Sequence, residues 1–172
     1  MAPTFDEIST LRWSVERDSV GAEARLHELG IELGRGSEPV ANYQMASVSG
    51  RLIFLSGHGP IDSSGTARRG KVGVDRSLEQ ARDDARVVGM NLLSTIREEL
   101  GSLDRVTRVV KVLGMVNCAP GFIRTPEVVD GCSDLLVDVF GPERGRHARS
   151  AIGVAELPFD ITVEIEMICE FD

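Results

Sequence analysis

Apolar residues between Asp75 and Leu100 recur at the three- and four-residue spacing of an amphipathic helix, the clearest pattern in the chain. The stripe consists of Leu78, Ala81, Ala85, Val88, Leu92 and Ile96. Ser77, with Gln80 three residues later, predicts a capping box at the start of this helix, and Gly101 predicts its end. We therefore expect one long helix that buries a single face.

Two further helices are indicated. Thr125 fits the N-cap of the first and Pro126 its first helical position, while the pair Gly141-Pro142 fits its end. Its apolar stripe is Val128, Cys132, Leu135, Leu136 and Val139. The sequence GAEARLHELGIEL, residues 21–33, predicts a shorter amphipathic helix that precedes the others.

Residues 146–171 alternate with a period of two, which is typical of half-buried strands. In the first of two predicted strands, Arg149, Ala151 and Gly153 share a face that is opposite Ser150, Ile152 and Val154. In the second, Glu164 and Glu166 lie opposite the apolar Ile161, Val163, Ile165 and Met167. The turn-like ELPFD between them suggests consecutive strands. Paired as a hairpin, they would place Arg149 opposite or diagonal to the two glutamates.

Three more strands are predicted upstream. NYQMAS and LIFLSG indicate a hairpin with Ser49-Gly50 near its tip, and residues 105–117 suit a central strand. The order is β-β-α-β-α-β-β after a leading helix, which indicates an α+β fold with a mixed sheet and both helices on one face. Oligomerisation is the natural cover for the other face. Residues 1–40 are predicted to be an arm, a short helix and a linker, and residues 41–172 the domain.

Composition fits this picture. The chain has 172 residues, of which 42% are hydrophobic and 27% charged, as in one ordinary globular domain. A net charge of −8 argues against binding to nucleic acid or to anionic membranes. Three cysteines without CxxC spacing favour a reduced environment, so the cytoplasm is the expected compartment. Neither a secretory signal nor an apolar run of membrane-spanning length is evident.

Arg149 is the first candidate for a functional residue. Its planar guanidinium suits a carboxylate, and the small Ala151 and Gly153 beside it leave room for a ligand. The alternative is a cross-strand ion pair with the glutamates on an exposed sheet face, worth roughly 0–1 kcal/mol. The three histidines are scattered without metal-ligand spacing, so no metal site is predicted.

Three segments together resemble the YjgF/RidA family of reactive intermediate deaminases. They are NYQMASVSGRLIFLSGHGPID, RVVKVLGMVN and HARSAIGVAELPFDITVEIEMI, which stand in the family's order and spacing between Asn42 and Ile168. The longer N-terminus, with GKVG at residues 70–73, resembles a separate, longer branch of that family.

The resemblance implies a chorismate-mutase-like fold in which three subunits pack their sheets into a barrel, with a cleft at each subunit interface. It also implies a small carboxylate substrate in that cleft. Enamines and imines, such as 2-aminoacrylate and 2-imino acids, would be hydrolysed there to 2-keto acids and ammonia. Because an imine carbon is already electrophilic, this hydrolysis needs neither a metal nor a cofactor.

The family's site residues match this sequence at unchanged spacing. Arg149 aligns with the arginine that holds the substrate carboxylate. Glu164 aligns with the glutamate that positions or activates water. Tyr43, and Ser56 with Gly57, align with residues that close the pocket.

Three positions depart from the deaminase-type pattern. Ala151 replaces a cysteine whose backbone carbonyl is the part credited with substrate contact. Asp130 replaces an asparagine; in the cleft it would disfavour a second carboxylate unless Arg149 offsets it, or select a ligand with a cationic or neutral group. His58 replaces a glutamine and is expected to alter the cleft wall.

Three functions follow as hypotheses. The first is an imine and enamine hydrolase with Arg149 and Glu164 as catalytic residues. The second is a non-catalytic trimeric protein that binds small carboxylates or regulates through them. The third is the endoribonuclease or translation-inhibitor activity sometimes attached to the family, against which the acidic charge argues.

Overall fold

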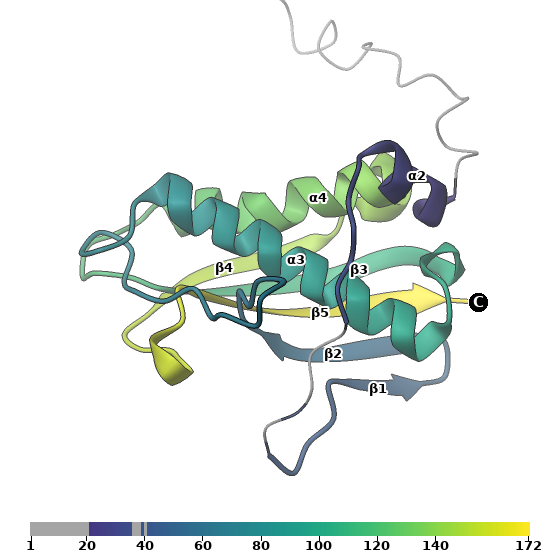
Figure 1. The fold of residues 1–172 in the computed structure, drawn as a ribbon, viewed down its shortest axis with the longest axis horizontal. Coiled ribbons are helices and arrows are strands. Elements are labelled where there is room, and N and C mark those ends of the chain that lie inside the picture. The colour runs from purple at the N-terminus through teal and green to yellow at the C-terminus, as the bar shows by residue number, and fades with distance from the viewer. Residues whose placement is uncertain (1–20, 36–38, 40) are drawn as a thin grey trace, which may run out of the picture.

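The computed structural model describes residues 21–35, 39 and 41–172, and the predicted arm over residues 1–20 lies outside these ranges. A five-stranded sheet carries the two long helices on one face (Figure 1). The strands are β1 (Ala46–Ser49), β2 (Leu52–His58), β3 (Val106–Asn117), β4 (Ala148–Val154) and β5 (Val163–Phe171). The helices are α2 (Ala22–Glu28), α3 (Leu78–Leu100) and α4 (Thr125–Gly145), with short 3-10 turns η1 (Leu103–Arg105) and η2 (Pro158–Asp160). The predicted α+β fold is confirmed.

The local signals of the sequence appear where they were expected. Ser77 accepts a hydrogen bond from the backbone N–H of Gln80, and the Gln80 side chain accepts one from Ser77, which completes the capping box of α3. Gly101 ends that helix in the left-handed region at φ 83°. Gly50, at φ 60°, turns the chain between β1 and β2.

Helix α4 differs from its prediction at both ends. Arg124, not Thr125, is the N-cap residue, and the Thr125 hydroxyl donates instead to the carbonyl of Ala151 at 3.1 Å. The helix is kinked rather than ended at Gly141, which lies at φ 77°, and one more turn follows to Gly145. Pro142 starts that turn because a proline is tolerated in the first turn of a helix.

The predicted hairpin between the last two strands is wrong. The sheet order is β1-β2-β5-β3-β4, so β3 lies between β4 and β5. Strand β4 pairs in parallel with β3 after the α4 crossover, whereas β5 returns antiparallel to both β3 and β2. The ELPFD segment is therefore a connection across one strand and not a hairpin turn.

The core lies between the sheet and the helices. Close approach of the layers depends on small residues: a Cβ at Gly114 of β3 would lie 2.4 Å from the Val129 side chain of α4. A Cβ at Gly131 of α4 would lie 2.0 Å from a backbone oxygen of α3. Ala22 and Leu26 of α2 belong to the same buried cluster. The proposed domain boundary at residue 40 stays a prediction.

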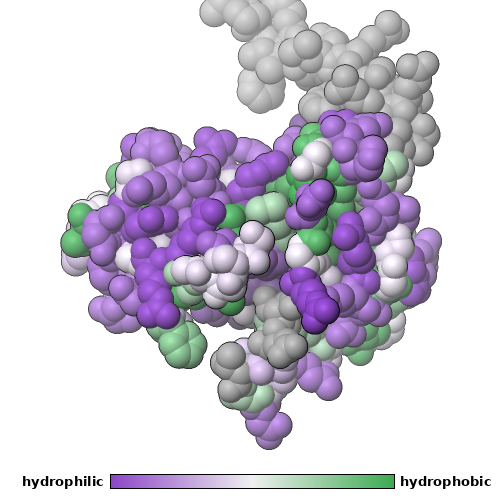
Figure 2. Space-filling view, viewed as in Figure 1, coloured by the Kyte–Doolittle hydropathy of each residue, from purple (hydrophilic) through white to green (hydrophobic). Residues whose placement is uncertain are grey.

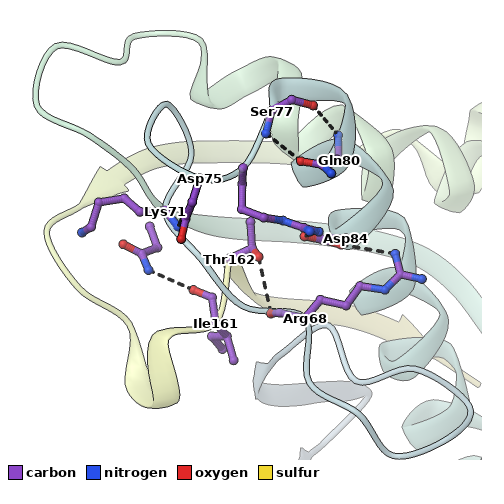
Figure 3. Close-up of polar contacts among 10 residues, drawn as sticks. Arg68, Lys71, Asp75, Ser77, Gln80, Asp84, Ile161 and Thr162 are labelled. Atoms are coloured by element: carbon purple, nitrogen blue, oxygen red, sulfur yellow. Dashed lines mark hydrogen bonds and ion pairs between the residues drawn. The ribbon is translucent and has the colours of Figure 1, made fainter.

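The long loop between β2 and α3 is fastened to the helix layer by a buried carboxylate (Figure 3). Asp84 of α3 is fully buried and pairs with Arg68 at 3.2 Å and with Arg76 at 2.5 Å. The backbone carbonyl of Arg68 accepts a hydrogen bond from the Thr162 hydroxyl at 3.4 Å, next to β5. The loop therefore joins the helices to one end of the sheet.

The second face of the sheet carries no helix in the part of the chain that the structure describes (Figure 1). Apolar side chains point outward on it, among them Phe54, 40% exposed, and Ile152, 46% exposed. We call it the open face. The surface over α3 on the opposite side is largely hydrophilic (Figure 2). Among the described helices, none combines the length and the apolar character that crossing a bilayer requires.

Candidate functional site

Arg149 lies at the edge of the sheet, on the face that the helices cover. It is aligned with Val112 of β3, which is aligned in turn with the buried Met167 of β5. Its side chain therefore meets α4, where Asp130 and Ser133, three residues apart, share a helix face. Arg149 Nη1 donates to Asp130 Oδ1 at 2.7 Å and to Ser133 Oγ at 3.0 Å.

His147 extends this group into a chain of hydrogen bonds. Its Nε2 lies 3.1 Å from Ser133 Oγ, and its Nδ1 lies 2.7 Å from the carbonyl oxygen of Gly145. A carbonyl only accepts, so Nδ1 carries the hydrogen. Ser133 accepts from Arg149 and donates to Nε2 of a neutral imidazole. Burial, followed by the positive charges of Arg149 and Lys111, lowers the pKa of His147 despite the opposing hydrogen bond to Gly145, which agrees with a neutral ring. We call Asp130, Ser133, His147 and Arg149 the Arg149 corner.

Ala151 stands next to this corner on β4. Its carbonyl, the group that the family pattern assigns to substrate contact, already accepts the hydrogen bond from Thr125. A carbonyl oxygen has two lone pairs, so one remains for a second donor.

Glu164 lies on the open face of β5. It is aligned with Met115 of β3, and a Cβ added at Gly57 of β2 would lie 2.0 Å from its Oε1. Glycine at position 57 therefore makes the space in which the carboxylate sits. Burial, followed by the negative charge of Glu166, raises the pKa of Glu164. We call Ser56, Gly57, Glu164 and Glu166 the Glu164 face.

Ser56 is hydrogen-bonded to the segment that contains Tyr43. Ser56 Oγ donates to the carbonyl of Gln44 at 2.7 Å, which ties β2 to the segment before β1. Tyr43 belongs to that segment and is 44% exposed. The open face has a hollow of about 290 Å³, whose lining includes Ser56, Phe54, Lys111 and Glu166.

Comparison with known proteins identifies the family. The family model described as "YjgF/chorismate_mutase-like, putative endoribonuclease" matches residues 23–170. The chain belongs to the YjgF/chorismate-mutase-like family. The family membership and the chorismate-mutase-like α+β fold of the chain are thereby confirmed, whereas the trimer stays a prediction.

Relatives of the chain share most of its length. It is 39% identical over 149 residues to Protein TCP17 of Trypanosoma cruzi, across 87% of this chain and 93% of that protein. The solved structure of Atu1372 from Agrobacterium tumefaciens, a protein of unknown function, is 38% identical with a TM-score of 0.80, across 91% of this chain and 96% of that one. A protein of Shewanella oneidensis MR-1, named a "putative endoribonuclease", is 27% identical with a TM-score of 0.84, across 88% of this chain and 100% of that one.

The motif residues of the YjgF/chorismate-mutase-like family form two groups within one chain. Arg149 and Glu164 point to opposite faces, and because β3 separates their strands, these strands lie about 10 Å apart. The expectation that Arg149 faces Glu164 in the same chain is therefore wrong. The alternative of a cross-strand ion pair with the glutamates is also wrong, because the partner of Arg149 is Asp130.

The sequence suggested that His58 forms part of a cleft wall, but in the structure it does not. Its side chain is 1% exposed and belongs to the layer between sheet and helices. Nδ1 lies 2.7 Å from the carbonyl oxygen of Ser56, and Nε2 lies 2.8 Å from Thr95 Oγ1 of α3. Burial lowers the pKa of His58, which favours the neutral ring, so this histidine is a packing residue between sheet and helices in this chain.

Sequence reasoning missed Ser133 and His147. Two patterns in the sequence were available to predict them: the helical spacing of Asp130 and Ser133, and the alternation of His147 with Arg149. Neither pattern says that β4 turns its arginine toward α4. That requires the pairing of β4 with β3.

Cysteine and metal chemistry find little support in the described residues. Burial raises the pKa of Cys132 and of Cys169 to about 12, so both are thiols at neutral pH. Among the residues that the structure describes, no three His, Cys, Asp or Glu side chains gather in a way that could hold a metal ion.

Proposed function

We propose that the chain hydrolyses 2-imino acids and their enamine tautomers to 2-keto acids and ammonia, in a cleft between two copies. The Arg149 corner of one copy and the Glu164 face of its neighbour would form the two walls. The copies would be those of a homotrimer, as the family resemblance implies. The observation that carries the proposal is the separation of the two groups onto opposite faces of the sheet, each incomplete alone.

The Arg149 corner suits the binding step. Both of the guanidinium hydrogen bonds found among the described residues come from Nη1, so Nη2 and Nε can take a substrate carboxylate. The side chain is 24% exposed, which lets a ligand reach it and still shields it from part of the solvent. Arg149 would therefore hold the carboxylate and orient the imine carbon.

The Glu164 face suits the proton transfers. Burial and Glu166 raise the pKa of Glu164 toward neutral pH, so its carboxyl can both accept and donate a proton. Glu164 takes a proton from water as the water oxygen bonds to the carbon of the protonated imine, and the C=N electron pair moves to nitrogen, which gives a neutral carbinolamine. In the second step Glu164 returns this proton to nitrogen, the C–N electron pair leaves with ammonia, and the hydroxyl proton passes to Glu164 as the C=O bond of the 2-keto acid forms.

The test measures the loss of 2-imino acids that an L-amino acid oxidase generates and semicarbazide traps. Wild type should accelerate this loss, and Arg149→Ala should lower the acceleration at least about hundredfold, because the carboxylate is no longer held. Arg146→Ala is the matched control, since Arg146 is exposed three residues away on the same segment. Full activity of Arg149→Ala would contradict the proposal, and so would RNA cleavage that requires Arg149.

A second candidate is a binding protein without turnover. It is favoured by the contact of Asp130 with Arg149, because that contact partly neutralises the anchor. Thermal stabilisation by small carboxylates, with no imine hydrolysis by the same preparation, would support this reading.

A further inference from the structure

The ion pair in the Arg149 corner presents two opposite charges side by side. Asp130 Oδ1 lies 2.7 Å from Arg149 Nη1, and the side chains are 38% and 24% exposed. The hydrogen bonds of the pair involve Nη1 and Oδ1 in the part of the chain that is described. One edge of the guanidinium and one carboxylate oxygen can therefore receive a ligand together.

The surroundings leave these two charges in balance. His147, the nearest titratable group of the corner, is neutral for the reasons given above. Arg82 of α3 lies within electrostatic range of Asp130, but its ion pair is with Asp134 at 2.6 Å. Lys111 donates to Ser150 at 2.7 Å, and both are aligned with residues of the open face. The corner therefore offers one positive and one negative group with a net charge near zero.

A ligand that satisfies both groups must carry opposite charges close together. In a protonated 2-imino acid, the nitrogen and the carboxylate are bonded to the same carbon, and the same holds for an α-amino acid. A 2-keto acid carries the carboxylate alone and meets the Asp130 charge without an offsetting cation.

We propose that Asp130 makes the site selective for zwitterionic ligands, so that the protonated imine binds in preference to its keto acid product. This inference rests on the proposed function for the reaction itself. Arg149 holds the carboxylate and Asp130 the cationic nitrogen. The protonated imine is the electrophilic form, so the same contact favours the species that water attacks. Hydrolysis removes the cation, and the anionic product is then released more easily.

The selectivity is tested by calorimetric titration with L-alanine and pyruvate, which share a carbon skeleton and differ in the cationic nitrogen. Wild type should bind L-alanine more tightly. Asp130→Asn keeps the size of the side chain and removes its charge, and should shift the affinity ratio toward pyruvate by about tenfold, as expected for one partly screened charge. Asp130→Glu should keep the preference.

Asp134→Asn is the matched control, because Asp134 is an exposed carboxylate one turn further along α4; its ratio should stay within about twofold of wild type. An unchanged ratio in Asp130→Asn would overturn the inference, and so would a wild-type preference for pyruvate or no binding of either ligand. Imine hydrolysis is measured on the same preparations. If the protein hydrolyses imines but Asp130→Asn does not shift the affinity ratio, the inference fails and the proposed function stands. If Asp130→Asn shifts the ratio but the protein does not hydrolyse imines, the proposed function fails and the selectivity for zwitterionic ligands stands.

Discussion

The Arg149 corner and the Glu164 face differ in how far one chain satisfies their charges. In the corner, a carboxylate, a hydroxyl and a carbonyl form a continuous chain of hydrogen bonds with Arg149 and His147. On the face, Glu164 sits half-buried beside a second carboxylate, and its pKa is raised as a result. The Arg149 corner is therefore held by hydrogen bonds within one chain, whereas the Glu164 face holds a carboxyl whose charged form is disfavoured. Such a difference is typical of a binding element and a proton-transfer element.

The largest expected effect tests whether the two regions work across copies. Arg149→Ala and Glu164→Gln should each be nearly inactive alone. When the two variants are unfolded together in equal amounts and refolded, they mix at random within each closed oligomer. One interface in four then carries both native residues, so about a quarter of wild-type activity should return. The measurement is imine hydrolysis after refolding, and the two variants mixed without unfolding are the control. Mixed oligomers that stay inactive would place both residues in one copy's site.

A smaller effect is expected when the Glu164 face is deformed and the corner is left intact. In Gly57→Ala the new Cβ would occupy the place of Glu164 Oε1, so the carboxyl must move. We expect kcat/KM to fall by about ten- to hundredfold while binding of L-alanine at the corner is retained. Gly34→Ala is the control, since a Cβ there meets nothing within 4 Å. An unchanged kcat/KM would show that the position of Glu164 does not matter to the reaction.

The smallest effect concerns stability. The folded pKa of Glu164 is raised above its ordinary 4.5, so the native state binds the proton more tightly than the unfolded chain does. The stabilisation that Glu164 contributes to the native state is fully present below pH 4.5 and is lost as the pH rises through the folded pKa. Glu164→Gln should therefore match wild type in Tm at about pH 4 and exceed it by about 2 °C at about pH 7.

Thermal unfolding across this pH range measures the difference. Glu170→Gln on the same strand should show no such rise, because Glu170 lies near Arg51 rather than beside a second acidic group. A Tm difference that does not depend on pH would mean that the Glu164 carboxyl is well solvated or paired in the assembled protein.

Local signals predicted much of the local structure in this chain, although those at Thr125 and Gly141 misplaced the two ends of α4. Ser77 with Gln80, and the glycines at positions 50 and 101, encode their turns and caps within a few residues, and all were read correctly. The alternation in β4 separated Arg149 from Ile152, but it could not say which of the two faces the helices. Ile152 proved to lie on the open face, because β4 is an edge strand whose smaller residues pack beneath α4.

The candidate site was predictable in its members but not in its arrangement. Motif spacing named Arg149 and Glu164, whereas their placement on opposite faces depends on β3 entering between β4 and β5. No spacing along the chain contains that information, since it arises from the pairing of distant strands. The same limit hid the contact between Asp130 and Arg149, which the return of the chain after α4 creates.

The kink of α4 at Gly141 has a consequence for the order of folding. It turns the chain back at once, so that the contacts of Arg149 with Asp130 and of His147 with Ser133 span only 19 and 14 residues. Glu164 and Gly57 belong to strands from opposite ends of the domain. Because short loops close at a smaller entropic cost, the Arg149 corner can form while much of the sheet is still unpaired. In the proposed reaction, the group that would hold the carboxylate is then in place before the group that would transfer protons.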